Sequence, residues 1–123
     1  MEAAVAAASI GAGVTLITPV ASRIALMSCN PSLGGIAKGT LVREIDAMGG
    51  VTAISADRTA LQFRMLNMKK GPAVWGPRVQ TDVQEYCRVQ RDQLLSAGVS
   101  VVEDTVISLT GPTDRIAGVR LKS

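Results

Sequence analysis

Residues 1–18 constrain the fold more than any other part of the sequence. Residues 2–10 are rich in alanine and predict a helix, and Gly11 stands where a glycine commonly follows a helix end. Residues 14–18 form a short apolar run that predicts a buried strand. A helix that ends in glycine and leads into a buried strand is half of a βαβ unit. The first strand of that unit has no counterpart in the sequence.

A second helix–strand pair suits the same sheet. Residues 81–96 give the strongest helical pattern, and Gly98 follows it. Residues 99–102 then predict a strand that should run parallel to residues 14–18, adjacent to them or one strand apart. The order of elements therefore predicts an α/β domain with a parallel sheet. A β-hairpin is expected beyond it, with strands at residues 105–110 and 116–122 around a turn at 111–114.

The middle of the chain carries weaker signals. Residues 40–48 predict a helix with one apolar stripe. Asn-Pro and Gly-Gly pairs indicate a loop over residues 22–35. Glycine and proline indicate at best an ordered loop over residues 69–77, and the pattern of residues 62–67 leaves helix and strand open. The apolar stripe of residues 40–48 consists of Leu41, Val42, Ile45 and Met48.

Composition limits both the core and the chemistry. The 123 residues, 12.8 kDa in mass, suit one small domain over residues 1–123. Hydrophobic residues make up 47%, but many are alanine, and there is one Phe, one Tyr and one Trp, so the core should be thin. The absence of histidine excludes Ser-His-Asp catalysis, Cys-His catalysis and histidine-ligated metal sites within this chain.

The basic charge is concentrated in one stretch. Residues 58–81 hold five basic residues and no acidic residue, whereas the whole chain has a net charge of only +3. Such a stretch attracts phosphate, from a nucleotide cofactor or from RNA. A solvated surface with acidic partners elsewhere in the fold explains the pattern equally well. The five residues are Arg58, Arg64, Lys69, Lys70 and Arg78.

Two glycine-rich segments resemble nucleotide-binding motifs without matching them. Residues 11–13 (Gly-Ala-Gly) follow a helix and open a strand, the reverse of a dinucleotide fingerprint. Residues 34–40 contain Lys-Gly-Thr instead of the Gly-Lys-Ser/Thr of a P-loop. The second segment still leads into a predicted helix, whose unpaired amides can receive an anion. A simple loop is the alternative.

The two cysteines occupy different settings. Cys29 lies in the predicted loop ahead of the glycine-rich segment, where helix amides can lower a thiol pKa and make it nucleophilic. Cys87 lies on the apolar stripe of the helix at residues 81–96, which also includes Gln90, and is expected in the core. The two lie too far apart in the sequence for a Cys-x-x-Cys pair, so free thiols in a reducing compartment are expected. A single disulfide between them is the alternative. Residues 1–19 lack a basic signal-peptide start, and Gly11 and Gly13 interrupt their apolar run, so we expect a cytoplasmic protein and no membrane partner.

Longer blocks of the sequence resemble one known family. Residues 27–39 (MSCNPSLGGIAKG) and 41–50 (LVREIDAMGG) closely resemble the glucose-inhibited division protein A family. A second block matches at residues 62–67 (QFRMLN), 70–74 (KGPAV) and 78–80 (RVQ), and the alanine-rich start resembles the family's first helix. This family is the FAD-dependent subunit of the enzyme that installs the 5-carboxymethylaminomethyl group on wobble uridine of tRNA.

The resemblance implies a fold, cofactors and partners. It implies a partial Rossmann-like FAD/NAD(P)-binding domain, and an enzyme that uses FAD, NADH and methylenetetrahydrofolate to modify tRNA. It also implies a GTPase partner subunit and a homodimer. Cys29 matches the family's loop cysteine and is the expected catalytic residue. Ser28 and Asn30 are expected to flank the flavin, and Val106 to contact the FAD adenine through its backbone.

The basic residues Lys69, Lys70 and Arg78 fit an RNA-facing patch by charge alone. No role is carried over to them from the family.

The sequence also departs from the family. The Gly-rich turn that binds the FAD pyrophosphate is absent, and so are the NADH-binding region and the C-terminal helices. We therefore expect an N-terminal piece of the FAD domain that binds FAD weakly or not at all when isolated. A non-enzymatic truncated remnant, or a small basic RNA-binding piece, is an alternative. A relative of the folate-dependent tRNA uracil methyltransferase is a weaker alternative, because the Ser-Cys-Asn-Pro and Lys-Gly-Pro-Ala-Val blocks favour the first family.

Overall fold

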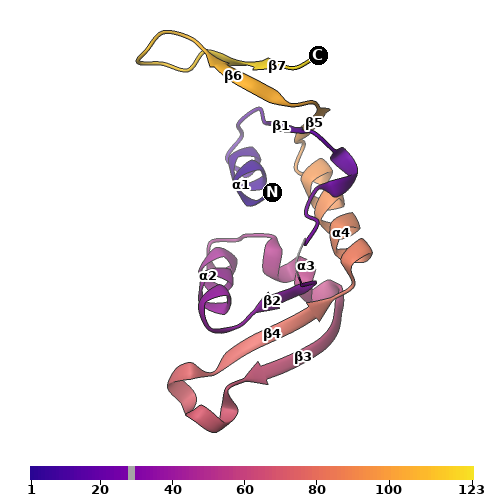
Figure 1. The fold of residues 1–123 in the computed structure, drawn as a ribbon, viewed down its shortest axis with the longest axis vertical. Helices are drawn as coiled ribbons and strands as arrows, with labels where there is room; N and C mark the ends of the chain where they lie inside the picture. The colour runs from indigo at the N-terminus through magenta and orange to yellow at the C-terminus, as the bar shows by residue number, and fades with distance from the viewer. Residues whose placement is uncertain (28–29) are drawn as a thin grey trace.

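The computed structural model describes residues 1–27 and 30–123. The chain forms four α-helices and seven strands within these ranges, with three short 3₁₀ turns (Figure 1). The helices are α1 (Glu2–Ser9), α2 (Ile36–Ala47), α3 (Thr52–Arg58) and α4 (Val83–Ser96). The strands are β1 (Thr15–Thr18), β2 (Ser32–Gly34), β3 (Ala60–Leu66), β4 (Gly76–Thr81), β5 (Ser100–Glu103), β6 (Val106–Thr110) and β7 (Gly118–Leu121). The 3₁₀ turns are η1 (Ala21–Arg23), η2 (Met68–Lys70) and η3 (Pro72–Val74).

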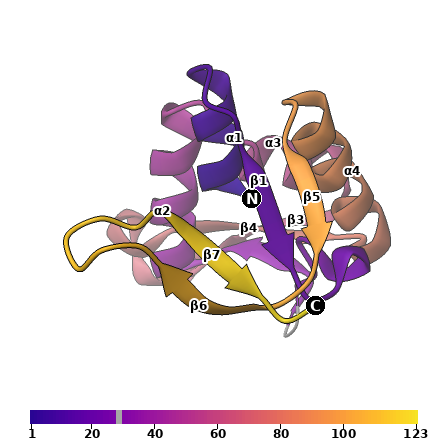
Figure 2. The same ribbon diagram turned by 90° about the horizontal axis from the view of Figure 1, so that it is seen from above.

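Strands β1 and β5 pair in parallel, which confirms the predicted α/β pairing. Their register runs from Thr15 opposite Ser100 to Thr18 opposite Glu103, and Figure 2 shows the two strands side by side. The predicted hairpin at the end of the chain is also present, as the antiparallel pair β6–β7. Parallel strands need a long crossover connection, and the chain between β1 and β5 includes the helices that such a connection usually contains.

The antiparallel sheet β2-β4-β3 is the main difference from the sequence expectations. Its strands occupy parts of the segments predicted as a loop (22–35), as undecided (62–67) and as an ordered loop (69–77). β2 has only three residues, and its hydrogen-bonding partner β4 lies more than forty positions away, with Leu33 opposite Val79. Pairing between such distant segments leaves little trace in a local pattern. The predicted loop survives at the tip of the β3–β4 hairpin, as η2 and η3.

Two helices of the middle region also differ from expectation. α2 begins at Ile36, four residues before the predicted start, and ends at Ala47. Of its predicted stripe, Leu41 and Met48 are 59% and 81% exposed, so the apolar face is only partly covered. α3 was not predicted at all. Its N-terminus is capped by the carboxylate of Glu2 from α1, a partner that no local pattern reveals.

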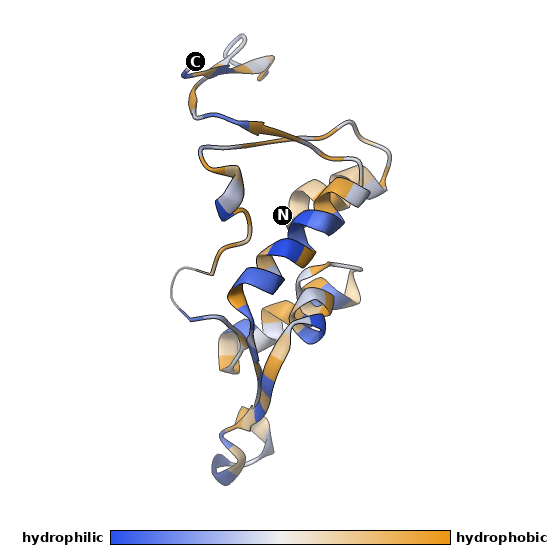
Figure 3. Cartoon of the chain, turned by 90° about the vertical axis from the view of Figure 1, so that its right-hand side faces the viewer, coloured by the Kyte–Doolittle hydropathy of each residue, from blue (hydrophilic) through white to orange (hydrophobic). Residues whose placement is uncertain are grey.

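The core is thin, as the composition predicts. One cluster of buried apolar side chains lies between α1, the segment after β1, α4 and the residue before β5, and its buried members are Ala4, Ile24, Leu94 and Val99. α4 supplies the largest share of buried residues, and the side of it seen in Figure 3 is largely hydrophilic. Polar residues are also fully buried, among them Gln90, Thr81 and Ser55. A core this small makes each polar contact important to the fold.

The molecule is elongated, with β6–β7 at one end and the tip of the β3–β4 hairpin at the other (Figure 1). α4 and the β1–β5 pair lie between these ends. Within the described ranges, no helix is long and apolar enough to cross a membrane.

Candidate functional site

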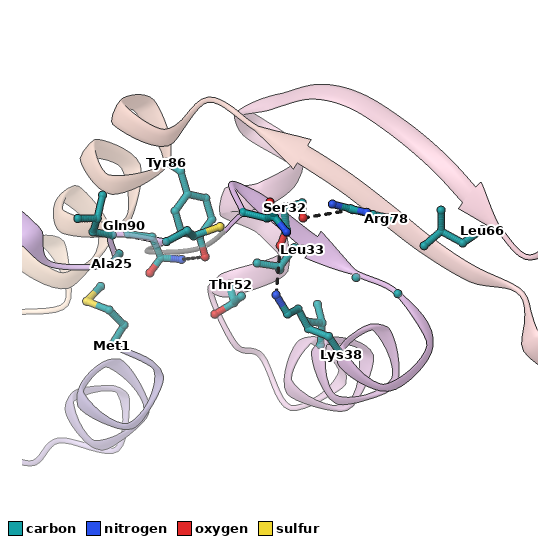
Figure 4. A pocket seen from close by; sticks show the side chains of 16 residues that line it. Met1, Ala25, Ser32, Leu33, Lys38, Thr52, Leu66, Arg78, Tyr86 and Gln90 are labelled. Atoms are coloured by element: carbon teal, nitrogen blue, oxygen red, sulfur yellow. Dashed lines mark hydrogen bonds between the residues drawn. The ribbon is translucent and has the colours of Figure 1, made fainter.

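An open cavity of about 710 Å³ lies between β2, α2 and α4 and is bordered by Met1, the residue before α1. Its volume is within the usual range for small-molecule sites, and its lining is mostly apolar with a few polar groups. Figure 4 shows Lys38 of α2, Arg78 of β4 and Gln90 of α4 among the side chains that surround it. The cavity is lined by Met1, Ala25, Leu26, Met27, Asn30, Ser32, Leu33, Gly34, Gly35, Lys38, Val42, Thr52, Leu66, Arg78, Tyr86 and Gln90.

The glycine-rich turn that leads into α2 forms one wall. Gly34 and Gly35 have φ values of +108° and +103°, a backbone region that disfavours other residues. A Cβ on Gly34 would lie 2.0 Å from the carbonyl oxygen of Pro77, so only glycine lets β2 approach β4 this closely. The Gly35 N–H donates a hydrogen bond to the same carbonyl at 2.9 Å. The N-cap residue of α2 is Gly35, which has no side chain to cap the helix, and no side chain among the described residues accepts a hydrogen bond from the first-turn amides, so these donors lie unused beside the cavity.

Ser32 links the two cations of the cavity. Its hydroxyl oxygen accepts a hydrogen bond from Arg78 Nε at 3.2 Å, and its backbone carbonyl accepts one from Lys38 Nζ at 3.3 Å (Figure 4). Ser32 itself is 6% exposed. The buried serine therefore orients both positive side chains toward the same part of the cavity wall.

Gln90 places an unused acceptor at the cavity. Its side chain is 1% exposed, and its Nε2 donates to the Tyr86 hydroxyl at 3.3 Å and to the Val51 carbonyl at 3.5 Å. Its Oε1 is buried and has no partner among the described residues. Burial raises the pKa of Tyr86, and a hydrogen bond with Thr52 partly opposes this, so Tyr86 stays protonated at neutral pH. A buried amide oxygen without a partner is a position where a ligand donor would be favourable.

The sequence-predicted site residues do not all lie together. Ser28 and Cys29 lie outside the described residues. Asn30 and Arg78 both line the cavity. Val106 opens β6 opposite Leu121, is 41% exposed, and is not part of the cavity lining.

Lys69 and Lys70 are exposed in η2, at the tip of the β3–β4 hairpin. The structure thus brings Asn30 and Arg78 to one cavity and leaves the two lysines farther along the hairpin.

Several lining residues were not predicted as functional. Lys38 lies in the segment that fails as a P-loop, and Gln90 was assigned to the core stripe of its helix. The signal for Gln90 was a lone amide among apolar stripe positions. Ser32 and Thr52 gave no signal, because β2 and α3 were not predicted.

Cys87 is buried in α4, as predicted, at 5% exposure. Burial raises the pKa of its thiol, and the charge of Arg91 opposes this only in part. A buried thiol with a raised pKa is a poor nucleophile. Within residues 1–27 and 30–123, no group of three or more Cys, Asp or Glu side chains is placed to hold a metal ion.

Comparison with known proteins gives consistent matches along the chain. A relative from Porphyromonas gingivalis named "tRNA uridine 5-carboxymethylaminomethyl modification enzyme MnmG" is 59% identical over 91 residues, 74% of this chain and 15% of its own length. A relative of the same name from Parabacteroides distasonis is 49% identical over 120 residues, 97% of this chain and 19% of its own length. The chain therefore spans about a fifth of the length of these relatives.

A solved structure extends the match to the fold. The structure of Aquifex aeolicus GidA in its form II crystal superposes with a TM-score of 0.92 at 40% identity, over 98% of this chain and 20% of that one. The family model described as Glucose inhibited division protein A matches residues 1–123. These matches bear out the resemblance carried by the cysteine loop and the Lys-Gly-Pro-Ala-Val block. The chain belongs to the glucose inhibited division protein A family.

Proposed function

We propose that the chain is a segment of the FAD-binding domain of an enzyme that installs the 5-carboxymethylaminomethyl group on wobble uridine of tRNA. The observation that carries this proposal is the cavity between the glycine-rich turn and α4, lined by residues of both family blocks. The printed names of the relatives, at 59% and 49% identity, support the same activity. We take residues 1–123 as one part of a single domain.

The cavity residues fit the ring system of a flavin. A flavin ring has an apolar body and a polar edge, and the cavity offers apolar walls such as Leu33 and Val42 beside polar groups. The Gln90 oxygen, which has no partner among the described residues, suits a ring N–H, and the amides that begin α2 suit a ring oxygen or a phosphate. FAD, when bound, would supply two-electron redox chemistry. In this proposal Ser28 and Asn30 flank the ring, and the Val106 backbone contacts the adenine.

Cys29 is the proposed catalytic residue. Its own position lies outside the described residues, but Met27 and Asn30, on either side of it in the sequence, line the cavity. Cys87 is buried with a raised thiol pKa, so it is the poorer candidate for a nucleophile. The proposal therefore gives Cys29 the chemistry and Cys87 a place in the core.

The remaining parts of the proposal concern partners. Lys69, Lys70 and Arg78 contact tRNA, which their charge and their place on one hairpin support. NADH serves as reductant and methylenetetrahydrofolate as carbon donor, and the whole enzyme works as a homodimer with a GTPase subunit in the cytoplasm. These assignments rest on family membership.

A chimaera tests the function. This chain would replace the matching 120 residues of the Parabacteroides distasonis relative, and tRNA modification would be measured by mass spectrometry of the digested tRNA. We expect modification by the chimaera, loss of modification in Cys29→Ser with flavin content unchanged, and retention in Cys87→Ala. A flavin-loaded chimaera that leaves tRNA unmodified contradicts the proposed function. Normal modification by Cys29→Ser contradicts the role of Cys29 alone.

A further inference from the structure

Two arginines face each other across the β3–β4 hairpin. Arg64 and Arg78 are directly opposite in the antiparallel register, so their side chains leave the same face of the sheet about 5 Å apart at Cβ. Arg64 is exposed and Arg78 is half-buried. Like charges directly opposite in a sheet destabilise it. An anion bound between the two arginines would offset this repulsion.

The described part of the chain supplies no such anion. The ion pairs found there involve only Arg88, with Glu85 and Asp92 on α4. Arg78 donates from Nε to the Ser32 hydroxyl and makes no other side-chain hydrogen bond with the described residues. Each guanidinium carries five N–H donors in a planar fork. The pair therefore holds a set of oriented donors that the described residues leave unused.

A groove surrounds the two arginines. It has a volume of about 140 Å³ and is lined by Gln62, Arg64, Leu66, Arg78 and Gln80. Gln62 is opposite Gln80 in the same register, so a pair of amides flanks the pair of cations. The groove contains no acidic residue. Two guanidinium forks with amide donors beside them match the oxygen atoms of a phosphate group.

The groove and the large cavity share two lining residues, Arg78 and Leu66. Arg78 is fixed toward the cavity by its bond to Ser32, as Figure 4 shows. If the phosphate of a ligand binds the arginine pair, the part of the ligand next to that phosphate therefore lies beside the cavity.

We propose that Arg64 and Arg78 together bind a backbone phosphate of the RNA strand next to the nucleotide whose base enters the cavity. This inference rests on the proposed tRNA-modifying function and adds Arg64 as a specific phosphate ligand. An enzyme that acts on a base must hold the strand while the base leaves its stack, and phosphate contacts set that register. Lys69 and Lys70 continue the row of cations toward the hairpin tip, which suits a repeating anion better than a single small one.

The test uses the chimaera described above, with tRNA affinity measured by fluorescence anisotropy over a range of salt concentrations. Arg64→Gln should weaken tRNA binding about ten-fold and reduce the salt dependence by roughly one counterion. Arg64→Lys should keep the salt dependence but recover only part of the affinity, because lysine lacks the fork. Arg120→Gln, an exposed strand arginine opposite Ser108 on β7, is the matched control and should bind tRNA normally. Circular dichroism and flavin content verify that each variant is folded.

Each outcome decides the question. An Arg64→Gln protein that is folded and binds tRNA like Arg120→Gln overturns the inference and leaves the proposed function standing. An unchanged tRNA affinity with a raised KM for NADH also overturns it and assigns the pair to a nucleotide cofactor. A folded, flavin-loaded chimaera that binds no tRNA contradicts the proposed function, and the inference falls with it.

Discussion

The backbone N–H of Thr52 donates a hydrogen bond of 2.6 Å to the carboxylate of Glu2, although fifty positions separate the two residues. The Thr52 hydroxyl bonds the same carboxylate oxygen, and the Val51 N–H reaches the other oxygen at 3.1 Å. A side chain of α1 thus accepts hydrogen bonds from two backbone amides at the N-terminus of α3. This carboxylate joins the start of the chain to the segment that presents Thr52 to the cavity.

We expect Glu2→Ala to lower the free energy of unfolding by about 1.5 to 3 kcal/mol, because several hydrogen bonds to a charged acceptor are lost. Urea unfolding followed by circular dichroism measures this change. The matched control is Glu44→Ala, an exposed carboxylate of α2, which should change stability by less than about 0.5 kcal/mol. Equal effects of the two substitutions would show that the cap contributes nothing.

The two glycines before α2 should respond differently to alanine. Gly35→Ala meets no neighbouring atom and suffers only backbone strain, about 1 to 3 kcal/mol, because Gly35 has φ +103° and ψ −175°. Gly34→Ala suffers the same strain and also drives its Cβ into the Pro77 carbonyl and the Arg78 Cα, so it should cost at least about 3 kcal/mol. Urea unfolding of the two variants compares them directly. Similar losses would mean that β2 and β4 can separate without cost.

The buried thiol of Cys87 predicts a dependence of stability on pH. Its pKa is raised in the folded chain, so the folded state holds the proton more tightly than the unfolded state does. This contribution is complete below the unfolded thiol pKa, near 8.5, and is lost as the pH rises through it toward the folded value. In a Cys29→Ser background, Cys87→Ala should therefore cost about 1 kcal/mol at pH 7 and less at pH 9.5. A cost that stays constant between these pH values would argue against the raised pKa.

Replacing Gln90 should weaken ligand binding more than it changes stability. Gln90→Leu removes a buried oxygen that has no partner and two long hydrogen bonds, so stability should change by less than about 1 kcal/mol. If Gln90 accepts a bond from the flavin ring, flavin affinity of the chimaera should fall about ten-fold, as measured by fluorescence titration. Unchanged affinity would assign Gln90 to packing alone.

Local patterns were sufficient where the stabilising contacts are local. The helix predicted at residues 81–96 appears as α4, because Asp82 caps it through the Glu85 N–H and its apolar stripe is buried. β1 and β5 were also predicted, because short apolar runs that directly follow helices are typical of buried strands. By contrast, β2 and α3 depend on β4 and on Glu2, and neither partner is visible from the neighbouring sequence.

The candidate site was predicted in part for the same reason. Asn30 was named because it lies in a compact sequence block beside the loop cysteine, and Arg78 was named because of its charge within a basic stretch. Gln90 was read as core because helical periodicity shows which face is buried but not whether a ligand lies against it. Arg64 was noted only as part of a basic stretch. Its significance comes from the strand register that places it opposite Arg78.

Arg78 lines both the cavity and the groove, so one guanidinium would contact a ligand in either site. If a ligand in the cavity changes the energy of the Arg78 guanidinium, it changes the affinity of the groove for an anion, and the reverse effect has the same factor. A ligand in the cavity and an RNA phosphate in the groove would then change each other's affinity through the Arg78 side chain. The size of this coupling would be the same whichever ligand binds first, and it would need no movement of the surrounding helices.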